Sequence, residues 1–131
     1  MTGVRKQARV AILDDDDSVR TAVGRLLMAA DLSVDQYASF GAFRKALERA
    51  RPDCLVLDLH MPDMDGIDVM NYLTRKGIKL PIVVVSGHDA PNASELCLSL
   101  GALSFLSKPV DADDLLRAIE GAMSTFPRPM H

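Results

Sequence analysis

The chain has 131 residues, of which 48% are hydrophobic and 25% are charged, and its net charge at pH 7 is −3. This length and balance suit a single domain, residues 1–131, that buries a core without disulfide or zinc cross-links. No run of Lys or Arg exceeds two residues, so the sequence lacks a basic patch for nucleic acid, and no apolar run approaches the length of a membrane span.

Apolar runs alternate with segments of helical period along the whole chain. In chain order we expect a strand over 8–13, a helix over 18–30, an edge strand over 33–37, a helix over 39–50, a strand over 54–57, a helix over 67–75, a strand over 81–85, a helix over 90–100, a strand over 103–106 and a last helix capped by Asp111. Five strands alternating with five helices predict an α/β fold with a doubly wound parallel sheet. The ligand site of such a sheet lies beyond the carboxyl ends of its strands.

Polar residues with complementary chemistry follow these expected strands. The first strand ends in Asp14 and Asp15, at the start of a run of four aspartates, and the third ends in Asp58. Ser86 follows the fourth strand and Lys108 the fifth. We expect these five side chains to share one site, with the next two aspartates of the run serving as helix-capping or solvated residues.

The three aspartates of this site predict a bound cation. Two carboxylates about 4 Å apart repel by roughly 4 kcal/mol at the dielectric constant near a protein surface. A partly hydrated site made of few carboxylates suits Mg²⁺ better than Ca²⁺. The segment Asp63-x-Asp65-Gly66-x-Asp68 copies part of a calcium loop but lacks its bidentate Glu, so we interpret it as a turn.

A cation and a lysine beside an exposed aspartate indicate phosphoryl transfer. Asp58 is the candidate nucleophile, which would form an acyl phosphate. Mg²⁺ and Lys108 would neutralise the phosphoryl oxygens, and the Ser86 hydroxyl would hydrogen-bond the bound group.

Four segments together resemble the receiver domains of two-component response regulators, in particular the FixJ-like type. They are ILDDDDSVR at 12–20, LDLHMPDMDG at 57–66, VSGH at 85–88 and GA-x-x-F-x-x-KP at 101–109. The likeness covers about residues 8–123. It implies a flavodoxin-like strand order 2-1-3-4-5.

The resemblance also implies a role for each matching residue. Asp58 would be the phosphoacceptor, and Asp14 and Asp15 the acidic pair that holds Mg²⁺ with Asp58 and the backbone carbonyl of His60. Lys108 would be the active-site cation, with a cis bond to Pro109. Ser86 and Phe105 would form the switch pair.

Three alternatives fit less well. A cobalamin-binding module carries D-x-H-x-x-G, but Asp63 stands where its glycine is needed. A flavin carrier needs a phosphate-binding loop after the first strand, where aspartates 14–17 would repel the phosphate. A phosphatase of the D-x-D type needs an acid at His60.

We therefore expect a phosphorylation-dependent switch that takes its phosphoryl group from a sensor histidine kinase or phosphotransfer protein. It is not an enzyme in the usual sense, since it only assists its own phosphorylation and dephosphorylation. Cys54 and Cys97 lack CxxC spacing, and no signal peptide is evident, so we expect reduced thiols and a cytoplasmic location. No DNA-binding segment follows the last expected helix, so the domain either acts through partners or belongs to a longer regulator.

Two further expectations concern the surface. The expected helix over 90–100 carries apolar residues on more than one face, with Glu95 its only acidic residue, which indicates a homodimer or partner surface together with the fifth strand and fifth helix. His60 and His88 each stand two residues beyond a site residue, and by the resemblance they flank the path of the hydrolytic water. We expect both to lengthen the lifetime of the phosphoryl group.

Overall fold

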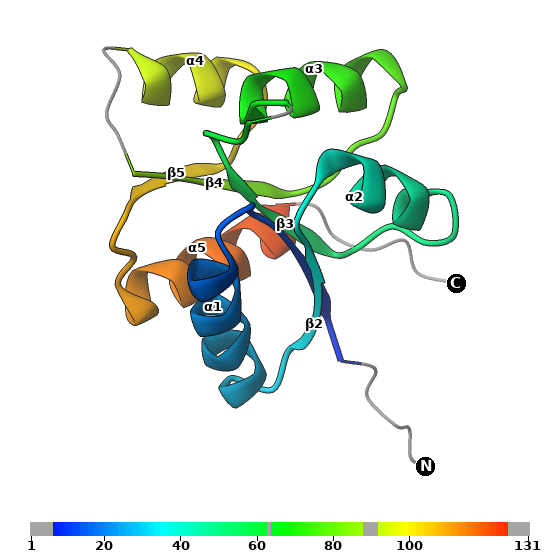
Figure 1. The fold of residues 1–131 in the computed structure, drawn as a ribbon. Coiled ribbons are helices and arrows are strands. Elements are labelled where there is room, and N and C mark those ends of the chain that lie inside the picture. Colours follow the sequence, from blue (N-terminus) through cyan, green and yellow to red (C-terminus); the bar gives the residue numbers. More distant parts are fainter. Residues whose placement is uncertain (1–6, 63, 88–91, 126–131) are drawn as a thin grey trace.

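Five strands and five helices alternate in the computed structural model, which describes residues 7–62, 64–87 and 92–125 (Figure 1). The strands are β1 (Arg9–Leu13), β2 (Ser33–Tyr37), β3 (Cys54–Asp58), β4 (Ile82–Ser86) and β5 (Ser104–Ser107). The helices are α1 (Asp17–Ala29), α2 (Phe40–Leu47), α3 (Gly66–Arg75), α4 (Ala93–Ser99) and α5 (Ala112–Thr125).

The strands form one parallel sheet in the order β2-β1-β3-β4-β5. This confirms both the doubly wound sheet and the strand order implied by the resemblance, and it places β2 at an edge as expected. Because β1 and β3 are neighbours, their carboxyl ends bring the two acidic segments of the sequence side by side.

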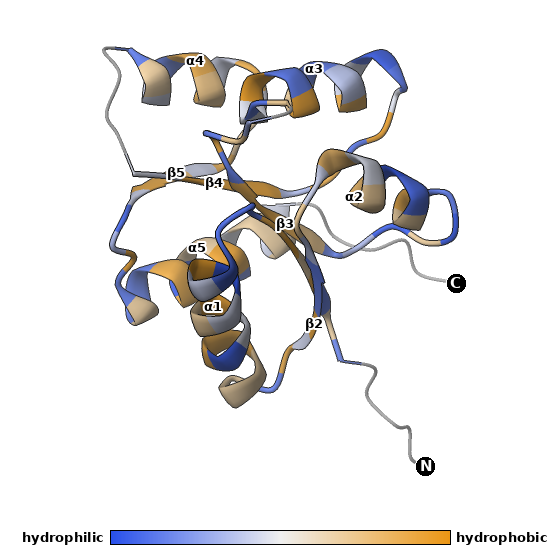
Figure 2. Cartoon of the chain, viewed as in Figure 1, coloured by the Kyte–Doolittle hydropathy of each residue, from blue (hydrophilic) through white to orange (hydrophobic). Residues whose placement is uncertain are grey.

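The helices cover both faces of the sheet, so the core has two layers. Figure 1 shows α2, α3 and α4 on one face and α1 and α5 on the other. The first layer contains Phe43 and Cys97, and the second contains Cys54, Leu27 and Ile119. β3 and β4, covered on both sides, are hydrophobic up to the polar residue that ends each of them, Asp58 or Ser86, as buried parallel strands are (Figure 2).

Side-chain caps fix where four of the helices begin. Asp16 accepts hydrogen bonds from the backbone N–H groups of Ser18 and Val19, and Ser39 accepts from Ala42. Asp65 caps α3, and the predicted cap Asp111 accepts from the backbone N–H of Asp114 at 3.0 Å. These caps satisfy backbone donors that have no partner within the helix.

Several boundaries differ from those predicted. The helix expected to end at 50 ends at Leu47, because Glu48 and Arg49 bond to carbonyls three residues back and tighten the chain into a turn. β3 and β4 each extend one residue further, to Asp58 and Ser86, because backbone pairing continues past the apolar run.

The helix expected from 90 begins at Ala93 within the described residues, while 90 and 91 lie outside them. In the part of the chain that the structure describes, we find no helix with both the length and the hydropathy to cross a bilayer.

Candidate functional site

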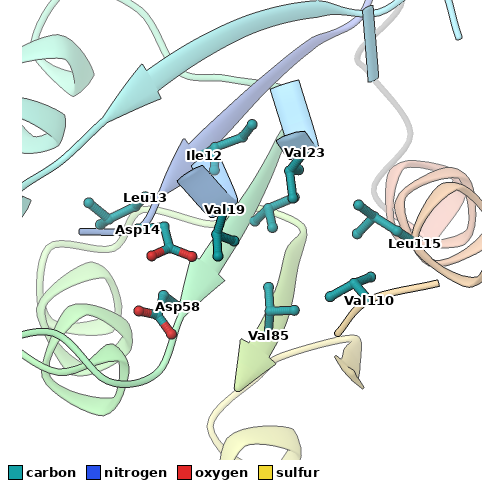
Figure 3. A pocket seen from close by; sticks show the side chains of 10 residues that line it. Ile12, Leu13, Asp14, Val19, Val23, Asp58, Val85, Val110 and Leu115 are labelled. Carbon is teal, nitrogen blue, oxygen red and sulfur yellow. The ribbon is translucent and has the colours of Figure 1, made fainter. Parts of the chain in front are cut away.

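Three carboxylates meet at the carboxyl edge of the sheet. Asp14 follows β1 and Asp58 ends β3, and both are buried, whereas Asp15 is exposed. One oxygen from each of the three lies within 4.8 Å of the others. Figure 3 shows the side chains of Asp14 and Asp58 next to each other at the ends of their strands. The sequence prediction that these three residues converge is thus confirmed by position.

Lys108 joins the two buried carboxylates. Its Nζ lies 3.1 Å from Asp14 Oδ2 and 3.3 Å from Asp58 Oδ1. The backbone N–H of Lys108 donates to the carbonyl of Ser86 at 2.8 Å, which anchors the segment after β5 to the end of β4. The Lys108–Pro109 bond is cis, as the resemblance implied.

The loop between β1 and α1 is held by a residue that the sequence analysis did not single out. Arg20 donates from Nη1 to the backbone carbonyl of Asp14 at 2.6 Å, and its Nη2 pairs with Asp17 Oδ1. The Asp14 side chain in turn accepts from the backbone N–H of Asp16 at 2.9 Å. Arg20 and Asp16 therefore fix the position of Asp14 from its two sides.

The charge of Asp58 is costly in this setting. Burial and the neighbouring Asp14 raise the pKa of Asp58 to about 6, against the opposing effects of Lys108 and of the His60 backbone N–H. Burial lowers the pKa of Lys108, but its hydrogen bond to Asp14 and the charges of Asp14 and Asp58 outweigh burial and raise it overall. Lys108 therefore stays a cation, and it is the nearest compensation for two carboxylates.

Gly66 brings the start of α3 against the end of β3. Its N–H donates to the carbonyl of Leu59 at 2.8 Å. A Cβ at this position would lie 3.0 Å from Leu59 Cα and 3.1 Å from the backbone oxygen of Asp58. Only glycine lets the helix approach this closely, so Gly66 sets the backbone on which Asp58 is carried.

The remaining expected site residues lie as follows. Ser86 is fully buried at the end of β4, beside Lys108. Phe105 is half-buried on β5, opposite Val84, and packs on the core layer that contains Cys97. His60 is exposed, and its backbone N–H lies 3.4 Å from Asp58 Oδ1, while His88 lies outside the described residues.

An apolar floor separates the carboxylates from the α1 and α5 side of the core (Figure 3). Side chains from five elements and from the segment before α5 line it, among them Ile12, Val19, Val56, Val85, Val110 and Leu115. Such a floor keeps water away from one side of Asp14 and Asp58, which is the physical reason that burial dominates the pKa of Asp58.

The donor set fits a hard divalent cation. Three ionised carboxylates and one lysine carry a local charge of −2, and every side-chain ligand offered by Asp14, Asp15 and Asp58 is an oxygen. Asp15 is exposed, which leaves that side of the cluster open to the waters that Mg²⁺ retains. Asp16, which caps α1, is not part of the cluster.

Comparison with known proteins identifies the family. The family model for the response regulator receiver domain matches residues 10–120. The chain belongs to this family. It therefore carries the receiver domain of a response regulator in two-component signalling, as the resemblance in its sequence indicated.

Relatives of this receiver domain are longer regulators. It is 36% identical over 132 residues to the response regulator protein TodT of Pseudomonas putida, across 97% of this chain and 58% of TodT. It is 35% identical over 115 residues to the transcriptional regulatory protein FixJ of Azorhizobium caulinodans, across 87% of this chain and 54% of FixJ. The chain thus spans little more than half the length of these relatives.

Solved structures share the fold of this receiver domain. The crystal structure of FixJ-N has a TM-score of 0.86 and 29% identity, and the alignment covers 95% of this chain and 100% of that one. A response regulator receiver protein from Burkholderia phymatum has a TM-score of 0.80 and 32% identity, with 90% and 96% covered. The likeness to FixJ thus holds in sequence and in structure.

Proposed function

We propose that Asp58 accepts a phosphoryl group from a sensor histidine kinase or a phosphotransfer protein in the cytoplasm. The observation that carries this proposal is the pairing of Lys108 with both Asp14 and Asp58, at 3.1 and 3.3 Å, inside a cluster of three carboxylates. A site with two negative charges in excess attracts a cation, and a cation beside a carboxylate neutralises an incoming phosphoryl group.

The transfer forms one bond and breaks one. A carboxylate oxygen of Asp58 attacks the phosphorus of a phosphorylated histidine, the phosphorus–nitrogen bond breaks, and its electron pair returns to the imidazole. Asp58 Oδ1 faces Lys108 Nζ and the His60 N–H, whereas Oδ2 has no hydrogen-bond donor among the described residues. The arrangement supports attack by Oδ2, with Lys108 held beside it to pair with the phosphoryl oxygens.

The side chains of Asp14, Asp15 and Asp58 and the backbone carbonyl of His60 would hold Mg²⁺. When bound, Mg²⁺ supplies positive charge against the equatorial oxygens of the transferring group. The domain itself contributes placement: Arg20 and Asp16 hold Asp14, and Gly66 holds the backbone after Asp58.

The phosphoryl group would act on the surface through Ser86 and Phe105. Ser86 lies buried at the end of the strand next to β3, where its hydroxyl would hydrogen-bond a phosphoryl oxygen. Phe105 is only half-buried on the adjoining strand, so it has room to change rotamer and reshape the surface over α4 and β5. Attack of water on the phosphorus then releases phosphate and restores the Asp58 carboxylate, so the domain assists only its own modification and its reversal.

The phosphoacceptor is tested by mass. The wild-type protein incubated with acetyl phosphate and Mg²⁺ should gain the mass of one phosphoryl group, and Asp58→Asn should gain none. Asp68→Asn, an exposed aspartate on α3, serves as the control and should label like the wild type. Full labelling of Asp58→Asn would refute the assignment.

The metal site is tested by thermal unfolding with and without Mg²⁺. Mg²⁺ should raise the melting temperature of the wild type by mass action, and Asp15→Asn should lose most of that gain. Asp16→Asn removes a carboxylate from the next position, which caps α1 and lies outside the cluster, so it should keep the gain. An equal gain in all three proteins would place the metal elsewhere.

A further inference from the structure

At the β2 edge of the sheet, some backbone N–H and C=O groups point away from the neighbouring strand. Among the described strands, β2 has a neighbour on one side only. The N–H of Ser33 donates to the carbonyl of Ala8 at 2.9 Å, and the carbonyl of Tyr37 accepts from the N–H of Asp14 at 3.2 Å. Peptide groups alternate in direction along a parallel strand. Val34 and Gln36 therefore direct their N–H and C=O groups away from β1, toward the open side.

A groove lies beside this edge, between β2 and α2. Alternate residues of β2 line one side, since Ser33, Asp35 and Tyr37 share a face of the strand. Residues of α2 and of the turn after it line the other side of the groove. Arg9, on the neighbouring strand β1, lines it as well. The residues of α2 and its turn are Ala42, Lys45, Ala46, Arg49 and Ala50. Three of these five residues are alanines, and their small side chains leave space between α2 and β2.

The groove is basic in a chain whose net charge is −3. Arg9, Lys45 and Arg49 line it together with one carboxylate, Asp35, which pairs with Arg9 at 3.2 Å. Lys45 and Arg49 are exposed, and neither forms an ion pair within the ranges that the structure describes. The groove therefore has two positive charges, those of Lys45 and Arg49, that no carboxylate among the described residues pairs with, and they lie beside the β2 edge.

We propose that this groove binds an extended acidic segment of a partner protein, which adds to β2 as a sixth strand. The main chain of the segment pairs with Val34 and Gln36, and its carboxylates on the α2 side pair with Lys45 and Arg49. Strand addition supplies main-chain hydrogen bonds for affinity, and side chains beside the edge supply selectivity. The opposing possibility is that Lys45 and Arg49 only keep other strands away from the edge, as charged residues commonly do.

The probe is a fluorescein-labelled peptide of about seven residues in which Glu and Val alternate, the length of an ordinary strand. Its binding to the whole chain is measured by fluorescence anisotropy at low and high salt. We expect saturable binding that weakens with salt, and no binding of the same peptide with Lys in place of Glu. A dissociation constant above about 1 mM for the acidic peptide would overturn the proposal.

Charge reversal locates the binding. Lys45→Glu combined with Arg49→Glu should weaken the acidic peptide by at least about tenfold. The matched control is Arg44→Glu combined with Arg51→Glu, two exposed residues from the same helix and the following loop that do not line the groove. The control should stay within about twofold of the wild type. Equal weakening of both double variants would mean diffuse attraction and would overturn the site.

Backbone methylation tests strand addition separately from charge. Two versions of the peptide are N-methylated at alternate residues, one at the Glu and one at the Val positions. One version directs its methyl groups at β2 and should lose binding, while the other directs them outward and should keep it. Equal binding of both versions would exclude a sixth strand. Tighter binding of an oligothymidylate than of the peptide, lost in the groove variant, would assign the groove to nucleic acid and overturn the proposal.

Discussion

Asp58 shows how a single residue combines reactivity with a cost in stability. It is almost fully buried beside Asp14, and only Lys108 among the described cations neutralises the pair. Its pKa is about 6, compared with an ordinary value of 3.8. The folded state therefore holds the Asp58 proton more tightly than the unfolded chain does, and the free energy of unfolding falls as pH rises through this interval.

This linkage predicts the effect of Asp58→Asn on stability without magnesium. Asparagine cannot ionise, so the variant does not lose stability as the Asp58 side chain of the wild type does. The free energy of unfolding of Asp58→Asn, relative to that of the wild type, should therefore rise by on the order of 2 kcal/mol between about pH 4 and pH 7. Urea unfolding in EDTA at the two pH values measures the gain, and Asp68→Asn should show none. If the gain of Asp58→Asn were the same at both pH values, the charge of Asp58 would not be the cause.

Of the residues at the site, the sequence predicted the charged ones that follow the predicted strands. Asp14, Asp15, Asp58 and Lys108 follow apolar runs, and the order of the strands then brings them together. Arg20 was not predicted, because an arginine on a helix usually points to solvent and its bond to the Asp14 carbonyl depends on the loop conformation. The roles of Ser86, Phe105 and the His60 carbonyl remain predictions.

At the scale of the element, the sequence predicted which segments form helices and strands better than where they end. The helix predicted over 39–50 begins one residue later, because Ser39 is its N-cap and not its first residue. It ends at Leu47, and the turn at Glu48 contains no glycine or proline from which this end could have been predicted. The contact of α3 with β3 at Gly66 was not predicted either, since a glycine in a turn gives no sign of which backbone will approach it.

The contact at Gly66 predicts a large penalty for one added methyl group. Gly66→Ala places a Cβ against backbone atoms of Asp58 and Leu59, which cannot move aside as a side chain can. We expect a loss of about 1–3 kcal/mol in the free energy of unfolding and slower labelling by acetyl phosphate. Gly121→Ala, in α5, is the matched control, because the Cβ that it adds would meet no atom within 4 Å outside its own helix turn. The control should stabilise the protein by about 0.5–1 kcal/mol. A neutral Gly66→Ala would show that α3 shifts freely.

At the scale of the whole molecule, α4 is the helix that the core covers least well. Cys97 is buried, but Leu96 and Leu98 on either side of it are 47% and 48% exposed. The expectation that this helix leaves apolar side chains at the surface is confirmed. The homodimer or partner surface itself remains a prediction.

Leu96→Glu tests that surface. It should weaken self-association of the phosphorylated or beryllofluoride-treated protein in sedimentation velocity, because a charge would have to be buried in the interface. Met28→Glu changes an equally large exposed residue, on α1 across the sheet, and should leave association unchanged. If wild-type protein stays monomeric with and without beryllofluoride, the homodimer prediction is wrong.

The two cysteines lie in different layers of the core, which makes them internal reporters of how the domain opens. Burial raises the pKa of Cys54 to about 12 and also raises that of Cys97, so neither thiol is nucleophilic while it stays packed. Cys97 is the buried residue of the short helix α4, whereas Cys54 lies in the central strand β3, on the face of the sheet that α1 and α5 cover. Iodoacetamide should therefore alkylate Cys97 whenever α4 lifts from the sheet, and Cys54 only when the sheet itself comes apart. The ratio of the two labelling rates separates release of one helix from global unfolding without any added probe.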